Sequence, residues 1–298
     1  MATEAKREEE EAKAKAAAEA KKKEGIREVF LKLERLDDGV PPVQGLDVTV
    51  QDLERHGFTF RIVDVPEDGD CGWYVAAWYD AAITSSDIVE EYDNSPLFTE
   101  DRRPRSQRSY HTALTQFKKR VGDFPDSHWL EACYIRRLNT LSADRTFVIF
   151  CHLGRTEGWS LCWYAGEGSE AADDMASTLK PIMISPARWP ELHDTLVGMG
   201  VALHVLVFRQ RHYQFGTVTQ WLTEPQRQGL EAIEAANARW KARRLAHWKD
   251  IVARRETGVV EGLGDDDAGG VGCAGDAAAA REEDRREEAR GEEEKREE

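Results

Sequence analysis

The sequence places a cysteine directly after an acidic turn, in the stretch VPEDGDCGWYVAAWY (residues 65–79). A thiol attacks a carbonyl carbon only as the thiolate, and a free cysteine holds little thiolate at neutral pH. A helix that begins at Cys71 would direct unpaired backbone N–H groups toward the sulfur and toward an oxyanion. Asp68, Gly69 and Asp70 are typical of a tight turn before such a helix. The stretch therefore suits a nucleophile, although a buried packing cysteine would have the same local sequence.

Local patterns predict the elements around this cysteine. An alternating segment at 58–65 indicates a strand before it, and helical segments are expected at 71–83, 109–121 and 126–141. Strand patterns then follow at 145–153, 159–165, 201–208 and 212–218. Three residues separate the last two strands, which predicts an antiparallel hairpin. Helices followed by mostly antiparallel strands indicate the α+β class.

Charged extensions flank this pattern. We expect a helical N-terminal extension over residues 1–40 and a globular domain over 41–222. A basic amphipathic helix with interleaved tryptophans is predicted at 223–256, followed by a disordered acidic tail at 257–298. The basic helix is typical either of a helix packed on its own domain or of a segment that binds acidic partners, calmodulin-like grooves or membrane surfaces.

Composition argues against several function classes. The chain of 298 residues has a formal net charge of −15, which disfavours nucleic acid as the main partner. We find no apolar run of the roughly 18–20 residues that a membrane-spanning helix needs, and no presequence at the N-terminus. A protein of the cytoplasm, with the nucleus as a second option, is expected.

The five cysteines are scattered: Cys71, Cys133, Cys151, Cys162 and Cys273. This spacing matches neither a disulfide framework nor a structural zinc template, even though His152 follows one of these cysteines. No phosphate-binding glycine motif is present either. We therefore expect reduced thiols, no metal and no cofactor.

Three segments together resemble the ovarian-tumour (OTU) family of cysteine proteases, papain-like enzymes that mostly cleave ubiquitin linkages. VPEDGDC, at 65–71, is similar to the family's D-G-x-C signature. Residues 126–150 are similar to its helix and buried strand, and residues 201–218 are similar to its C-terminal hairpin. The resemblance covers roughly residues 58–219. It implies a papain-like OTU fold, in which helices pack around a mostly antiparallel central sheet.

The resemblance also implies residue roles. Cys71 matches the nucleophile and His212 the general base, while Asp68, with Gly69 and Asp70, matches the loop of the oxyanion hole. The implied reaction is hydrolysis of peptide or isopeptide bonds at the C-terminus of ubiquitin or a ubiquitin-like modifier, without a cofactor. The implied partners are ubiquitin and polyubiquitin chains. His204 is a rival base, but its place in the middle of a strand is more typical of a core residue.

Two positions depart from the family pattern. Gln214 stands where an Asp or Asn commonly orients the histidine, so that either Gln214 or another acid, such as Asp64, would take this role. Gly72 and Trp73 follow the nucleophile, where larger apolar residues are usual. Trp73 is a candidate for packing over a glycine-rich substrate tail, with core packing as the alternative.

Two other functions stay open at this point. The chain could be an OTU-like module that binds ubiquitin with little or no turnover. The presence of Gln214 in place of an acid favours this alternative. It could also be an OTU-type protease that acts on another polypeptide, such as a viral or parasite polyprotein. The charged tails are candidates for binding other proteins.

Overall fold

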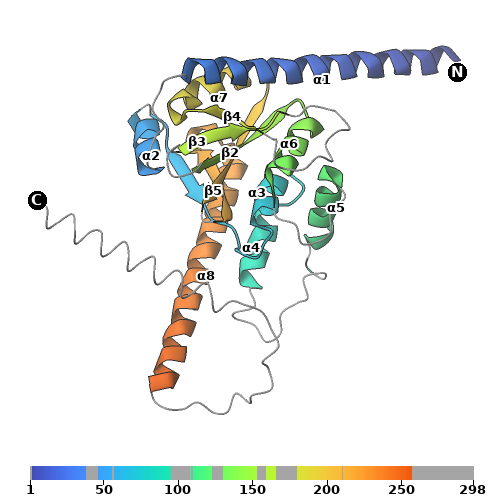
Figure 1. Cartoon of the computed structure of the whole chain (residues 1–298). Helices are drawn as coiled ribbons and strands as arrows, with labels where there is room; N and C mark the ends of the chain where they lie inside the picture. Colours follow the sequence, from blue (N-terminus) through green and yellow to red (C-terminus); the bar gives the residue numbers. More distant parts are fainter. Residues whose placement is uncertain are drawn as a thin grey trace, which may run out of the picture. The chain divides into compact units, whose positions relative to one another are not determined.

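The computed structural model describes residues 2–37, 46–55, 57–94, 108, 110–122, 130–152, 159–165, 180–209 and 211–256 (Figure 1). The chain divides into a unit of residues 1–245 and a second unit of residues 246–298. All the strands of the described part belong to the first unit. Within the described ranges, no helix combines the length and the apolar character needed to cross a membrane.

A six-stranded mixed sheet organises the first unit. Its strands are β1 (Phe60–Val63), β2 (Arg145–His152), β3 (Trp159–Trp163), β4 (Ile182–Ile184), β5 (Ala202–Arg209) and β6 (His212–Val218). Their order is β1-β6-β5-β2-β3-β4, in which β2 and β5 are parallel and every other pair is antiparallel. The α+β class and the predicted β5–β6 hairpin are therefore confirmed.

Helices cover both faces of this sheet (Figure 1). The first face carries α3 (Cys71–Tyr79), α4 (Ser85–Asp93), α5 (His111–Val121), α6 (Ala132–Leu141) and the first part of α8 (Glu224–Glu256). The second face carries α1 (Ala2–Asp37), α2 (Leu46–Arg55) and α7 (Trp189–Gly198). Short 3-10 turns lie at Pro186–Arg188 and Thr219–Trp221.

The alternation of side chains along β2 shows why two layers are needed. Phe147 and Ile149 point into the core of the first face, whereas Val148 and Phe150 point into the core of the second. Successive residues of a strand face opposite sides of the sheet, so a strand that is apolar throughout must be covered twice.

Both charged extensions contribute to the core. Phe30 of α1 is fully buried and stacks on Trp163 of β3, with ring centroids 4.4 Å apart. Leu230 and Ile233 of α8 are fully buried in the core of the first face. The packed unit thus extends beyond residues 41–222 at both ends, while the predicted acidic tail at 257–298 lies outside the described residues.

Element boundaries differ from the sequence-based expectations at the candidate site. Strand β1 ends at Val63, so that Asp64 lies in the connection to α3. Helix α3 ends at Tyr79, four residues earlier than predicted, because Ala81 adopts a left-handed conformation with φ 57°. Helix α6 begins at Ala132, and residues 123–129 lie outside the described part.

Candidate functional site

Cys71 is the first residue of α3, as the sequence predicts. The N–H group of Tyr74 donates to the carbonyl of Asp70 at 3.0 Å, which closes the first helical turn. Gly69 has φ +90°, a conformation that side chains disfavour, so the turn before the helix requires glycine there. The Cys71 side chain is 4% exposed, and its Sγ accepts a hydrogen bond of 3.4 Å from the Tyr213 backbone N–H.

Gly72 explains how the sheet comes so close to the cysteine. A Cβ atom on Gly72 would lie 2.7 Å from Cβ of Leu130 and 2.8 Å from Cδ2 of Tyr213. Both distances are shorter than real carbon contacts, so a larger residue would push β6 away from α3. The glycine at this position therefore has a steric reason.

His212 is the first residue of β6, opposite Arg209 across the hairpin. The Cys71 thiol lies close enough to its ring to favour the imidazolium. Nε2 of the ring lies 3.3 Å from Oδ1 of Asp64. This is an ion-pair contact, because the buried Nε2 has no aligned hydrogen-bond partner within the described part of the chain. His212 thus lies between the thiol and a carboxylate.

Asp64 reaches His212 because β1 and β6 are neighbours, with Val63 opposite Phe215. Its Oδ1 also accepts a hydrogen bond of 2.5 Å from Nε2 of Gln214. Gln214, the predicted partner of the histidine, therefore holds the carboxylate that contacts the histidine.

The far oxygen of the Asp64 carboxylate faces helix α8. Oδ2 lies 2.9 Å from Nζ of Lys241 and 3.4 Å from Nδ2 of Asn237. The sequence analysis missed both α8 residues. Lys241 is 177 positions away from Asp64 and shares no pattern with it, so no local signal identifies the contact.

Opposing effects set the protonation of this pair. Burial lowers the pKa of His212, but the contacts with Asp64 and Cys71 outweigh burial and raise the pKa to about 9. Burial likewise raises the pKa of Asp64, but the contacts with His212, Gln214 and Lys241 outweigh it and hold the pKa well below its usual range. At neutral pH the pair is a carboxylate next to an imidazolium.

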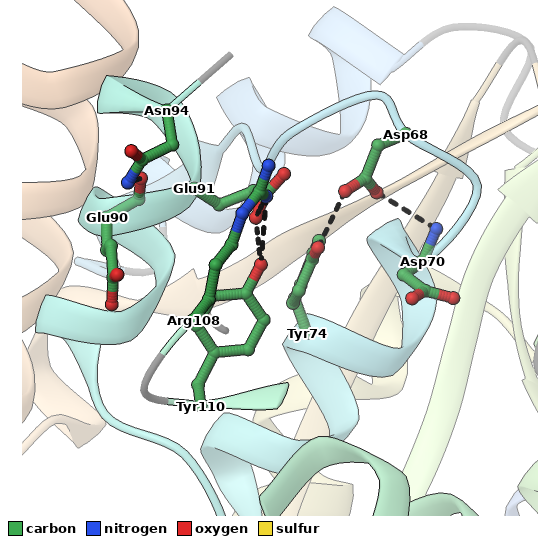
Figure 2. Close-up of polar contacts among 8 residues, drawn as sticks. All are labelled: Asp68, Asp70, Tyr74, Glu90, Glu91, Asn94, Arg108 and Tyr110. Atoms are coloured by element: carbon green, nitrogen blue, oxygen red, sulfur yellow. Dashed lines mark hydrogen bonds and ion pairs between the residues drawn. The ribbon is translucent and has the colours of Figure 1, made fainter. Parts of the chain in front are cut away.

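Asp68 holds the turn in front of the cysteine, as Figure 2 shows. Its Oδ1 accepts the Asp70 backbone N–H at 3.0 Å, and its Oδ2 accepts the Tyr74 hydroxyl at 2.6 Å. The Asp70 carboxylate pairs with Nζ of Lys118 at 2.6 Å. Because the Asp70 N–H is occupied by Asp68, the first-turn N–H groups that begin at Cys71 are the candidate oxyanion donors.

A buried polar cluster packs against Tyr74, next to this turn (Figure 2). The ring of Tyr74 packs edge-on against Tyr110, with centroids 6.0 Å apart. The Tyr110 hydroxyl and the Arg108 guanidinium both donate to the carboxylate of Glu91, which is 6% exposed. A buried charge pair of this kind is costly to break. It therefore holds Tyr110 in place against Tyr74, which binds Asp68 of the turn.

Comparisons with models of protein families, with curated proteins and with solved structures found no match. The geometry and the sequence motifs therefore carry the functional argument.

Trp73 does not offer a surface to a substrate. Its side chain is fully buried and packs against Phe117 and Tyr134, with Nζ of Lys118 5.7 Å from its ring. The predicted substrate-binding role finds no exposed surface at Trp73, because every residue of α3 from Cys71 to Trp78 is buried. Core packing, the alternative, is the observed role.

The rival base His204 is not part of the site. Its ring stacks on Tyr79 at 4.4 Å between centroids and lies 5.2 Å from Phe147. Burial, reinforced by the positive charge of Arg145, lowers the pKa of His204. A ring held neutral among aromatic side chains is a packing residue.

The interactions of His212 that raise its pKa involve none of the other described cysteines. Cys151 and Cys162 are buried free thiols whose Sγ atoms are 3.6 Å apart. Burial and the nearby Glu131 raise the pKa of Cys133, which disfavours its thiolate. Among the described residues, no group of three or more His, Cys, Asp and Glu side chains could hold a metal ion.

Proposed function

We propose that this protein is a cysteine hydrolase that cleaves peptide or isopeptide bonds at the C-terminus of ubiquitin or a ubiquitin-like modifier. The observation that carries the proposal is the convergence of Cys71, His212 and Asp64. They come from a helix start, a strand start and the loop after β1, and His212 contacts both of the others. A nucleophile, a base and a residue that orients the base form the standard set for this chemistry.

The mechanism follows from these contacts. Proton transfer from Cys71 to His212 forms a thiolate–imidazolium pair, in which the Asp64 carboxylate stabilises the imidazolium that later supplies the proton. The thiolate attacks the substrate carbonyl, and the N–H groups at the start of α3 stabilise the oxyanion. His212 then protonates the leaving amine, and water hydrolyses the thioester, which returns the thiol.

The choice of substrate rests on the sequence resemblance. The turn held by Asp68 and Gly69 has the D-G-x-C pattern of the OTU family, and His212 opens the strand as in the family's C-terminal hairpin. Ubiquitin is therefore the first substrate to test. A cytoplasmic or nuclear location stays a prediction from the sequence.

One observation favours the binding-module alternative. The Cys71 side chain is only 4% exposed, and a nucleophile must meet its substrate. An OTU-like module that binds ubiquitin without turnover would tolerate such burial, whereas an enzyme must uncover the sulfur when substrate binds.

A ubiquitin probe with a thiol-reactive group at its C-terminus separates these functions. We expect covalent capture by the wild-type chain, and neither capture nor ubiquitin-chain cleavage by Cys71→Ala. Cys133→Ala is the matched control, because Cys133 is more exposed but has a raised pKa and no contact with His212 in the structure. It should be captured as the wild type is.

Other outcomes decide between the alternatives. Reversible binding of ubiquitin without capture would support the module. Reaction of Cys71 with a small alkylating reagent that depends on His212, without capture by ubiquitin probes, would point to another polypeptide substrate. Full chain cleavage by purified Cys71→Ala would refute the hydrolase mechanism.

A further inference from the structure

Helix α8 contacts the candidate site at the Asp64 carboxylate. Its first part is anchored in the core by Leu230 and Ile233, both fully buried. Arg61 of β1 forms an ion pair with Glu234 of the same helix, and the ring of Trp240 lies 6.2 Å from that of Tyr92. Because these contacts fix the helix, the α8 side chains that point at the site have a defined position.

The two oxygens of the Asp64 carboxylate contact different elements. Oδ1 faces the strand, where it meets Gln214 at 2.5 Å and His212 at 3.3 Å. Oδ2 faces α8, where it meets Lys241 at 2.9 Å and Asn237 at 3.4 Å. The α8 contacts hold one oxygen in place, so the other oxygen is turned toward the histidine.

We propose that Lys241 is a positioning residue of the catalytic site, which orients the Asp64 carboxylate and limits how strongly that carboxylate favours the protonated form of His212. The inference rests on the proposed roles of Cys71 and His212. It also gives the basic helix a function within its own domain, where the sequence left open whether it binds an acidic partner.

The charged groups around His212 define the effect of Lys241. Asp64 and Glu67 face the ring from the loop after β1, and the Cys71 thiol faces it from α3. All three favour the imidazolium. Tyr92 of α4 lies near the same acids and stays neutral, because burial and these acids raise its pKa.

Cations oppose these groups. Lys241 is the cation in direct contact with Asp64 from another element, while Arg211 and Arg209 adjoin His212 within the hairpin itself. A positive charge held on the carboxylate reduces the attraction between carboxylate and imidazolium. Removing Lys241 should therefore let His212 keep its proton to a higher pH.

A role in stability alone is poorly supported. The Lys241 side chain is 61% exposed, and exposed ion pairs contribute little to folding. A variant at this position should therefore stay folded, and a change in the titration of His212 would not arise from loss of structure.

The test compares three variants of the full chain by NMR titration of the His212 imidazole, assigned with His212→Gln. Lys241→Met should raise the titration midpoint by roughly half a pH unit. Lys241→Arg keeps the charge and should change it little. Lys249→Met removes the same charge from an exposed position of the same helix and is the matched control, for which no shift is expected.

Activity gives a second readout. If the alkaline limb of the pH profile of kcat/KM reports His212, it should move upward in Lys241→Met and stay in place in Lys241→Arg. The proposal is overturned if Lys241→Met leaves the midpoint unchanged, or if Lys249→Met shifts it equally. Absence of probe capture by the wild type would instead refute the proposed function, while the titration would still decide whether Lys241 acts on His212.

Discussion

The β5–β6 hairpin carries one histidine near its open end and another at its turn, and the two have opposite properties. His204 and His212 are both partly buried. The pKa of His204 is lowered, whereas the pKa of His212 is raised to about 9. Burial opposes the charged form at both positions, so burial does not separate them.

The neighbours of each ring account for the difference. At His204 the nearest side chains are the rings of Tyr79 and Phe147, and Arg145 adds a further positive charge that disfavours protonation. At His212 the Asp64 carboxylate overcomes the cost of burial. A histidine becomes a candidate base through its partners, and its presence on a strand of the correct hairpin is not sufficient.

The largest expected effect comes from replacing His212, the proposed base of the two histidines. His212→Gln should lower kcat/KM for ubiquitin-chain cleavage by roughly a thousandfold, because the general base is lost. His204→Phe, which keeps an aromatic ring against Tyr79, should stay within about threefold of the wild type. Cleavage assays on purified variants, with circular dichroism to verify folding, measure both.

The comparison would fail in either of two ways. A folded His204→Phe protein with activity as low as that of His212→Gln would assign the base to the wrong ring. Unchanged cleavage by His212→Gln would mean that Cys71 reacts without this base.

Much of this arrangement could be predicted from local signals. The helix start at Cys71 follows from a turn sequence next to an apolar segment, and the hairpin follows from alternating residues on either side of a short loop. These patterns involve residues close together in the chain. They place Cys71 correctly at the start of its helix and His212 at the start of its strand.

The rest depends on contacts between distant residues. Asp64 meets His212 only because β1 pairs with β6, a register that no local pattern specifies. Lys241 reaches the same carboxylate through the packing of α8. The sequence left Trp73 open between a substrate contact and core packing, and the structure buries every residue of α3 from Cys71 to Trp78.

The second prediction sharpens the comparison at the carboxylate that distinguishes the two histidines. Asp64→Asn keeps the shape of the side chain but removes its charge, so it should lower kcat/KM by roughly a hundredfold and lower the pKa of His212. Gln214→Ala removes only a hydrogen bond to that carboxylate, so a loss of roughly threefold to tenfold is expected. Steady-state kinetics and NMR titration of His212 measure these effects.

The relative size of the two activity losses shows which residue orients His212. If Gln214→Ala lost more activity than Asp64→Asn, Gln214 would orient the histidine directly, as the family pattern suggests. A normal His212 titration in Asp64→Asn would remove Asp64 from the catalytic set.

The last prediction concerns stability, and here the two histidines should act in opposite pH ranges. The pKa of His212 rises from an ordinary value of 6.5 to about 9 on folding, so the folded state binds the extra proton. Its stabilising contribution is complete below pH 6.5 and is lost as the pH rises through 9. Over these 2.5 pH units (9 − 6.5) the loss is at most about 3 kcal/mol.

His204 should give the opposite slope on the acid side. Its folded-state pKa is lowered, so the unfolded chain takes up a proton below pH 6.5 and the folded state loses stability as the pH falls. Urea unfolding from pH 5 to pH 10 tests both slopes: His204→Phe should flatten the acid side, and His212→Gln the alkaline side. If each variant flattened the other's range, the charge states assigned to the two rings would be reversed. If both flattened the same range, the two histidines would titrate alike, and their neighbours would not explain why only one of them can serve as the base.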